Sequence, residues 1–306
     1  MTDVSAAARQ QVPSGRGGLS NLAQRTLFAL AAIPVVLAAV WFGDWALASI
    51  LAIASALAAW EFYRIAEKLG TRPLARAGIA VSALLPLVIH ARYLGLPVDR
   101  IVSTSFAAVG VIALFSVVIF ARGVSGRPLE SVSLTVFGVL YTGAMLSFAY
   151  ALRYHDYAVG RAAGTALLMM TLALVWISDT AAYVVGRTMG KRKLIPSVSP
   201  GKTVAGAIGA LVVSAVASWA LVRFLLVSQA QLGLRPVHAL LFGIAISIAV
   251  QLGDLAESLI KRQAGVKDSS HIIPGHGGVL DRIDGMLFAL PVAYLLLSQW
   301  LTPVPR

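Results

Sequence analysis

Long apolar segments, separated by short polar stretches, follow one another along the chain from residue 27 to residue 302. Each runs for 16 to 25 residues, and an α-helix needs about 20 apolar residues to cross a bilayer. The runs are continuous, unlike the alternating strands of a membrane barrel. The predicted spans are 27–43, 46–62, 77–92, 101–121, 132–152, 165–185, 203–227, 237–260 and 283–302. The pattern therefore predicts an all-α, polytopic integral membrane protein with about nine transmembrane helices.

The composition excludes a soluble, disordered or fibrous protein. Of the 306 residues, 58% are hydrophobic and 12% are charged, whereas a soluble domain has about 45–50% apolar and about 25% charged residues. The chain has no cysteine. This excludes disulfide bonds, thiolate catalysis and cysteine-ligated zinc or iron–sulfur sites.

Positive charge is unevenly distributed along the chain. The net charge is +12, from 25 lysines and arginines against 13 acidic residues. Of the 25 cationic residues, 18 fall in alternate inter-span segments, which are 1–26, 63–76, 122–131, 186–202 and 261–282. Cytoplasmic loops are enriched in Lys and Arg and face anionic headgroups, so we expect the N-terminus inside and the C-terminus outside. The excess of positive charge thus indicates a lipid bilayer and an anionic substrate as partners, and no nucleic acid.

The chain divides into a tail and two halves. Residues 1–25 are polar and are predicted to form a disordered cytoplasmic tail; they are too long for the n-region of a signal peptide, so we expect no cleavage. Residues 26–160 carry ionisable groups at the ends of their spans and are predicted to be an N-terminal scaffold half. Residues 161–306 carry nearly all the unusual polar residues. They are predicted to be a catalytic half with a polar cavity that faces the cytoplasm.

The first unusual polar group lies in the sixth predicted span. An acidic side chain inside a span costs several kcal/mol unless it is paired or lines a wet cavity, so it is a functional candidate. Asp179 and Tyr183 are four residues apart and share a helix face. Arg187 continues that face at the predicted inner surface. The alternative is a buried ion pair that only orders the helix.

The second group lies near the end of the eighth predicted span. Asp254 and Ser258 share a helix face. Lys261 or Arg262 continues that face, and Glu257 borders it. Carboxylate and hydroxyl oxygens are the hard ligands that Mg²⁺ prefers. The alternative is an ordinary helix end with ion pairs inside the helix.

The third group surrounds a loop of proline and glycine, 274–278, which contains His276. Glycine allows a backbone to approach a ligand closely. Asp281 and Asp284 follow at the start of the last span, and their spacing of three places both on one side. Carboxylates at a helix N-terminus can also act only as caps for the helix dipole, but this explains one aspartate and not the whole group.

The fourth group is a basic loop, 191–203, between the sixth and seventh spans. It combines lysine and arginine with Ser199, Lys202 and Thr203 directly before a helix, which suits phosphate binding at a helix N-terminus. It lacks the spacing of a P-loop. The alternative is a basic loop that contacts only lipid headgroups.

Together the four groups favour one class of chemistry. Carboxylates from two helix ends, flanked by basic loops at one face of the membrane, are typical of phosphoryl or nucleotidyl transfer, which depends on positioning and charge neutralisation. One substrate would lie in the membrane, and a phosphate-rich partner would come from the cytoplasm. An ion-coupled transporter is the alternative of another class. Its site would lie near the midplane and repeat in two halves.

The segments 258–262, 267–268 and 276–284 read Ser-Leu-Ile-Lys-Arg, Lys-Asp and His-Gly-Gly-Val-Leu-Asp-Arg-Ile-Asp. Their order and spacing resemble the signature of phosphatidate cytidylyltransferases, which are also called CDP-diacylglycerol synthases. The stretch 179–203 and the Arg-Thr pair before the first span are also similar to that family. The specific similarity covers about residues 176–290, while the first half is similar only in hydropathy.

The resemblance implies an all-helical membrane enzyme that converts CTP and phosphatidic acid to CDP-diacylglycerol and pyrophosphate with Mg²⁺. It also implies a homodimer in a bacterial inner membrane, with the active site on the cytoplasmic side. The resemblance further implies a site for two cations, with a monovalent ion such as K⁺ beside Mg²⁺. Phosphatidate brings its own phosphate nucleophile, so no nucleophilic side chain is required.

The resemblance further implies roles for individual residues. The implied metal ligands are Asp254 and Asp281, assisted by Asp284, Glu257 and Ser258. Contacts with phosphates and with the leaving pyrophosphate are implied for Lys261, Arg262, Lys267 and Arg282, and a phosphate contact for His276. Binding of the lipid headgroup or of the CTP tail is implied for Arg187, Ser199, Lys202 and Thr203. The other candidates are Asp268 in the catalytic group and Asp179, Tyr183, Gly277 and Gly278 in the substrate-binding group.

One position departs from the family pattern. Many relatives carry an acidic residue two places after the Lys202-Thr203 pair, where this chain has Ala205 followed by Gly206. Either the missing carboxylate is dispensable, or this member of the family differs in rate or substrate. Because the metal-binding region is intact, we expect the first. A CTP-dependent kinase of a lipid alcohol would share the CTP and metal chemistry, but the complete signature argues against it.

Overall fold

The computed structural model describes residues 21–98, 103–158, 160–273 and 277–304, apart from the side chains of 21–29. The predicted tail lies almost entirely outside these ranges. Within them the chain is predominantly helical, so the predicted all-α class is confirmed.

Each of the nine predicted spans overlaps one helical rod in the described part of the chain. The rods are α1 (Asn21–Phe42), α2 (Asp44–Lys68), α3 (Ala75–Tyr93), α4 (Thr104–Ala121), α5–η2–α6 (Pro128–Gly138, Val139–Ala144 and Met145–Arg153), α7 (Gly160–Met189), α8–η3 (Val204–Leu221 and Val222–Ala230), α9 (Pro236–Gln263) and α10 (Leu280–Trp300). Among the described residues, seven rods are long and apolar enough to cross a membrane. The polytopic membrane fold is confirmed, and nine is an approximate count of its spans.

Local sequence explains where several helices begin. The hydroxyl groups of Ser103 and Thr203 accept hydrogen bonds from the first turns of α4 and α8, which satisfies amide groups that lack a partner inside the helix. Pro128 and Pro236 occupy the first turns of α5 and α9. Proline is well tolerated there because no helical hydrogen bond is lost.

Four short strands connect the helices. They are β1 (Lys193–Ile195), β2 (Ser199–Thr203), β3 (Leu232–Gly233) and β4 (Thr302–Pro303). β1 and β2 form an antiparallel hairpin in which Lys193 pairs with Thr203 and Ile195 with Ser199. The sequence predicted only a basic loop here. The hairpin therefore gives the candidate phosphate-binding segment a fixed place at the end of α7.

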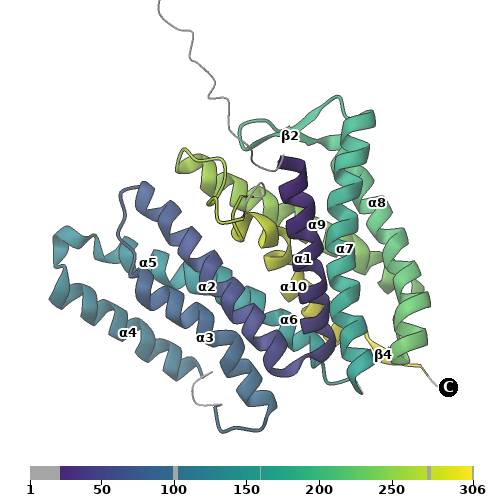
Figure 1. Cartoon of the computed structure of the whole chain (residues 1–306), viewed down its shortest axis with the longest axis horizontal. Coiled ribbons are helices and arrows are strands. Elements are labelled where there is room, and N and C mark those ends of the chain that lie inside the picture. Colours follow the sequence, from purple (N-terminus) through teal and green to yellow (C-terminus); the bar gives the residue numbers. More distant parts are fainter. Residues whose placement is uncertain (1–20, 99–102, 159, 274–276, 305–306) are drawn as a thin grey trace, which may run out of the picture.

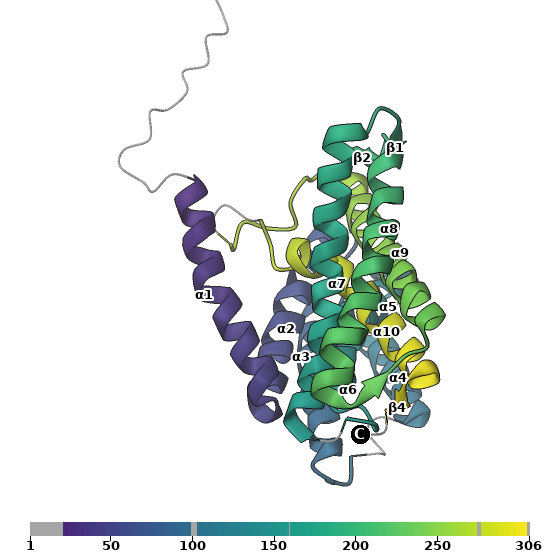
Figure 2. The same ribbon diagram turned by 90° about the vertical axis from the view of Figure 1, so that its right-hand side faces the viewer.

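The helices form a bundle whose two sides differ in the part of the chain that supplies them (Figure 1). Helices α2 to α5 lie on one side, α7 and α8 on the other, and α6, α9 and α10 between them. The strongest contacts join α7 to α8, α2 to α3, α9 to α10 and α8 to α9. Helix α1 leans away from the bundle at its N-terminal end, which is also the end where the β1–β2 hairpin lies (Figure 2).

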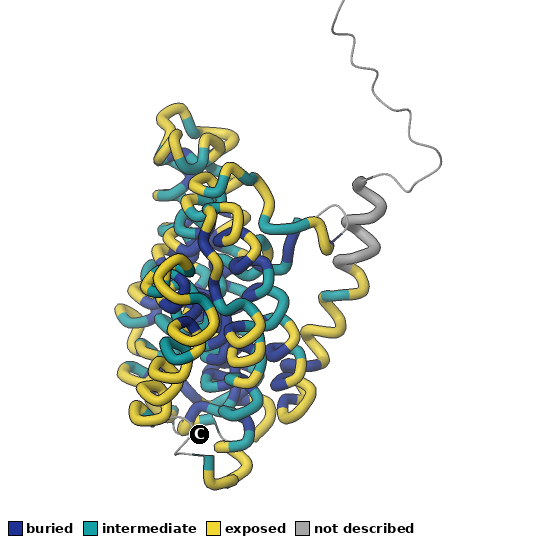
Figure 3. The backbone as a smooth tube through the Cα atoms, turned by 90° about the vertical axis from the view of Figure 1, so that its left-hand side faces the viewer, coloured by how far each residue is buried: buried dark blue, intermediate teal, exposed yellow. Residues whose placement is uncertain are grey.

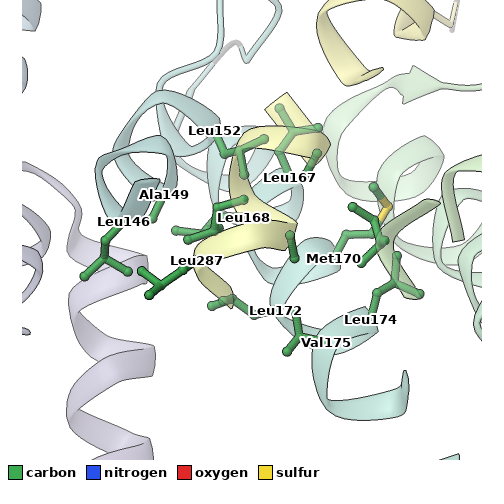
Figure 4. Packing of buried hydrophobic residues seen from close by; sticks show 14 of the residues in the cluster. Leu146, Ala149, Leu152, Leu167, Leu168, Met170, Leu172, Leu174, Val175 and Leu287 are labelled. Atoms are coloured by element: carbon green, nitrogen blue, oxygen red, sulfur yellow. The ribbon is translucent and has the colours of Figure 1, made fainter. Parts of the chain in front are cut away.

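The core joins the two predicted halves of the chain. Buried leucine and alanine side chains of α6 meet those of α7, together with Leu287 of α10 (Figure 4). Exposed residues follow the outer faces of the rods, including α1 (Figure 3). Many are large and apolar, as at Leu30 and Phe120. An apolar outer face is what a lipid environment requires.

Small residues bring α8 and α9 close together. A Cβ added to Gly243 of α9 would lie 2.2 Å from the carbonyl oxygen of Ser214 on α8. Such close backbone approach is a usual way for membrane helices to pack, because lipid tails provide no hydrophobic drive for association.

We expect Gly243→Ala to destabilise the protein by about 1–3 kcal/mol, because the added methyl group overpacks this contact. Gly110→Ala is the matched control: Gly110 lies inside α4, where an added Cβ meets nothing within 4 Å. There alanine should leave the thermal midpoint unchanged or raise it. Thermal unfolding in one detergent measures both variants, and an equal midpoint for Gly243→Ala and wild type would contradict the packing argument.

Candidate functional site

A cavity of about 660 Å³ lies where the β1–β2 hairpin meets α7, α8 and α9. It is lined by seven of the residues that the sequence singled out, which are Asp179, Tyr183, Arg187, Ser199, Lys202, Thr203 and Asp254. They come from three separate groups of the sequence. The fold thus brings the polar face of α7, the basic hairpin and the acidic end of α9 around one space. Lys193 and Gln251 also line it; the sequence analysis gave Gln251 no role and included Lys193 only as part of the basic loop 191–203.

Opposite charges face each other across this cavity. Lys202 of β2 forms an ion pair with Asp254 of α9, with 2.6 Å between Nζ and Oδ2. The Oδ1 atom of Asp254 accepts a hydrogen bond from the hydroxyl of Ser258 at 3.3 Å. On α7, Arg187 donates a hydrogen bond of 2.8 Å to the hydroxyl of Tyr183. The cavity therefore contains cations that could contact phosphates and a carboxylate that could hold a metal ion.

Glycines let α8 and the last residue of the hairpin lie close to α7. A Cβ on Gly206 of α8 would lie 2.5 Å from the carbonyl oxygen of Ala182 on α7, and one on Gly190, directly after α7, would lie 2.4 Å from Oγ1 of Thr203. Thr203 is buried, and its hydroxyl accepts a hydrogen bond of 3.1 Å from the amide of Gly206. Thr203 thus caps α8, a role that the sequence analysis did not give it.

A second cluster lies between α9 and α10. Lys261 places its ammonium group 2.6 Å from Oε2 of Glu257 and 2.5 Å from Oδ1 of Asp281. The side chain of Glu257 is 2% exposed, and its Oε1 has no hydrogen-bond partner among the described residues. The sequence predicted Lys261 as a phosphate ligand. That contact remains a prediction, and in the structure Lys261 pairs with two carboxylates from different helices.

Asp281 is the most heavily bonded acid of this cluster. Its Oδ2 atom accepts hydrogen bonds from the amide and hydroxyl of Ser269, at 3.0 and 2.9 Å, and from the amide of Gly278 at 2.8 Å. Gly277 has a φ of 85°, and a Cβ there would lie 2.6 Å from the same oxygen. The glycines of the signature thus let the backbone wrap closely around Asp281.

Asp284 connects the second cluster to the cavity. It lies one turn after Asp281 on α10, and its carboxylate accepts a hydrogen bond from the amide of Gly285. Its backbone lies against α9, since a Cβ on Gly253, the residue before Asp254, would lie 2.5 Å from the carbonyl oxygen of Asp284. Among the described residues, no three acidic or histidine side chains already form a metal site.

The remaining candidates lie around these clusters or outside the description. Arg262 is exposed, and its Nε donates to the carbonyl oxygen of Val198 in the hairpin turn at 3.4 Å. Lys267, Asp268 and Arg282 are exposed near the cluster. His276 lies outside the described residues, so its predicted phosphate contact remains a prediction. Ala205 lies half-buried in the first turn of α8 and does not line the cavity.

Sequence reasoning missed Glu61, which lies on α2 in the predicted scaffold half. Its buried carboxylate accepts hydrogen bonds from the segment that joins α9 to α10. Glu61 falls at the end of its predicted span, where a charged residue is ordinary. The available signal was an acid within an otherwise apolar turn, between Trp60 and Phe62.

Similarity to known proteins assigns the chain to a family. The chain is similar to phosphatidate cytidylyltransferases of Staphylococcus haemolyticus (42% identity over 161 residues, 53% of this chain and 57% of the relative) and Bacillus subtilis (44% over 135 residues, 44% and 48%). That of Haemophilus influenzae is 46% identical over 129 residues, 42% of this chain and 44% of the relative. The chain thus matches about half the length of these curated relatives. The model of the cytidylyltransferase family matches residues 23–300, nearly the whole sequence, and the chain therefore belongs to that family.

Proposed function

We propose that this protein transfers the cytidylyl group of CTP to phosphatidate, forming CDP-diacylglycerol and pyrophosphate. The observation that carries this proposal is the cavity, in which the cations of the hairpin face acids of α7 and α9 at the end of a membrane bundle. Such a place is accessible both to a lipid headgroup and to a nucleotide from water. Membership of the cytidylyltransferase family and similarity to phosphatidate cytidylyltransferases support the same reaction.

The reaction needs no nucleophile from the protein. A phosphate oxygen of phosphatidate forms a bond to the α-phosphorus of CTP, and the bond from that phosphorus to the bridging β-phosphate oxygen breaks. Pyrophosphate leaves with that electron pair. Lys193, Lys202 and Arg187 line the cavity, so they are placed to neutralise phosphate charge, which is the main catalytic need of such a transfer.

We propose Mg²⁺ as the cofactor, held by Asp254 and Asp281 with Asp284 and Glu257 nearby. The donor set fits, because these are hard oxygen ligands. Mg²⁺ is usually bound by one or two carboxylates plus substrate phosphates and water, so a preformed cage is not required. When bound, it would supply further charge neutralisation at the phosphates. A monovalent cation such as K⁺ and a homodimer complete the proposal.

The proposed location is a bacterial inner membrane, with the cavity on the cytoplasmic side. The hairpin carries part of the excess of Lys and Arg that marks cytoplasmic loops. The relatives from bacteria and the apolar helices support a membrane location.

The reaction is tested with the purified protein in mixed micelles of phosphatidic acid with labelled CTP and Mg²⁺. We expect CDP-diacylglycerol from the wild type and a loss of about 10²- to 10³-fold for Asp281→Asn and Asp254→Asn, the range known for removal of one charge-stabilising group. Asp156→Asn is the control, because Asp156 is an exposed aspartate in the loop after α6.

The outcomes separate the parts of the proposal. Normal activity in both site variants would keep the reaction and refute the metal ligands. No lipid product, but release of CDP when a lipid alcohol is supplied, would replace the transferase with a kinase. No turnover of CTP by the wild type would refute the reaction itself.

The orientation is testable because the chain has no cysteine. Ser197→Cys places a single thiol in the exposed turn of the hairpin, and Asp156→Cys places one in the loop after α6. A maleimide that does not cross membranes should label Ser197→Cys in inverted vesicles only and Asp156→Cys in intact spheroplasts only. The reverse pattern would contradict the cytoplasmic site.

A further inference from the structure

Glu61 is a fully buried acid that the proposed chemistry does not use. It lies on α2, and its exposed fraction is 0%. Among the described residues, no lysine or arginine forms an ion pair with it. A buried carboxylate without a cation is stable only if hydrogen bonds replace its lost hydration. The hydrogen-bond donors around Glu61 therefore show which segment of the chain it holds in place.

Glu61 accepts four hydrogen bonds from the connection between α9 and α10, residues 264–279, and from the residue that follows. From within this connection, the hydroxyls of Ser269 and Ser270 donate to it at 2.9 and 2.6 Å. Where the connection meets α10, the amides of Val279 and Leu280 donate at 2.9 and 2.7 Å. One carboxylate of α2 thus joins the middle of the connection to the start of α10.

The same carboxylate takes the place of a helix cap. Leu280 begins α10, and within the described residues Val279 provides no side-chain cap. The first amides of a helix lack partners inside it, and they favour a negative charge. Glu61 satisfies two of them from a position 218 and 219 residues earlier in the chain.

Gly278 explains how Glu61 fits. A Cβ at this position would lie 2.5 Å from both carboxylate oxygens of Glu61 and 2.0 Å from the hydroxyl oxygen of Ser269. Any side chain at Gly278 would therefore displace Glu61. This glycine of the signature makes room for an acid from the other half of the chain.

Ser269 links Glu61 to the reaction site. Its hydroxyl lies 2.9 Å from Oε2 of Glu61 and 2.9 Å from Oδ2 of Asp281. It carries one hydrogen, so the two carboxylates share this donor. Its amide and that of Gly278 also bind Asp281. Ser269 thus binds both carboxylates. Gly278, whose amide binds Asp281, directly precedes Val279, whose amide binds Glu61.

We propose that Glu61 is a positioning residue, which holds the α9–α10 connection so that Asp281 and its helix present their carboxylates correctly for the transfer. The expected effect of Glu61 on catalysis rests on the proposed function. It assigns part of the working site to the half of the chain that the sequence marked as scaffold.

The test uses Glu61→Gln in the full-length protein. Glutamine has nearly the same size, but its amide group turns hydrogens toward two of the four donors. Glu67→Gln is the matched control, because Glu67 is an exposed glutamate on the same helix, in its last turn. Three quantities are measured: kcat with the KM for each substrate, the thermal midpoint, and hydrogen exchange of peptides covering 264–282 without substrate.

For Glu61→Gln we expect kcat to fall about 10- to 100-fold, the range for residues that orient a functional side chain without contacting the substrate. Both KM values should change by less than about threefold, because Glu61 contacts no substrate. Exchange should become faster within 264–282 alone, with a thermal midpoint near that of the wild type. Glu67→Gln should equal the wild type throughout. Unchanged kcat and unchanged exchange in Glu61→Gln would overturn the proposal.

Ser270→Ala covers the case in which Glu61→Gln fails to fold. It removes one donor and leaves the carboxylate, so kcat should fall severalfold with the thermal midpoint kept; wild-type kcat here would overturn the proposal. The outcomes also separate the two hypotheses. A wild type without transferase activity refutes the proposed function, while hydrogen exchange still decides whether Glu61 holds the connection.

Discussion

The ammonium group of Lys261 keeps together two carboxylates that would otherwise repel each other at a poorly hydrated place. Glu257 belongs to α9 and Asp281 to α10, so this one charge also joins two helices. Removing one member of a buried ion pair costs about 3–5 kcal/mol, because the remaining charge has no partner. Asp281 is held further by hydrogen bonds from Ser269 and Gly278. Without the charge of Lys261, the two carboxylates could not both remain ionised.

The sequence was informative where local geometry decides the outcome. A run of apolar residues long enough to cross a bilayer has few folds open to it, because every backbone polar group must be satisfied inside lipid. Offsets of four along a helix likewise place side chains together, and the structure shows the contacts of Asp254 with Ser258 and of Glu257 with Lys261. The spans and the acidic face of α9 therefore followed from spacing alone.

The rest depends on contacts between distant parts of the chain. Ser269 and Glu61 are 208 residues apart, and no local pattern relates them. Glu61 resembled an ordinary charged residue at the end of a span, since only the fold shows the amides that surround it. The β1–β2 hairpin was read as a loop because its strands are short. The cap of α8 is a local contact, since Thr203 accepts from an amide three residues later, so a threonine directly before a helix was a signal for it. The pairing of Lys261 with Asp281 joins two helices, and no local pattern reveals it.

The ion pairs of the site bear on the proposed binding of a metal ion and a nucleotide. Lys202 pairs with Asp254, and Lys261 pairs with both Asp281 and Glu257. At Asp254, a metal ion and a phosphate that arrive together could exchange partners, because the metal ion would take the carboxylate and the phosphate would take the ammonium group of Lys202. A metal ion alone would displace Lys202 and leave its charge unpaired, whereas Lys261 would keep Glu257 as its partner after losing Asp281. For the proposed function, the pairing at Asp254 therefore favours joint binding of metal and nucleotide over a permanently occupied metal site.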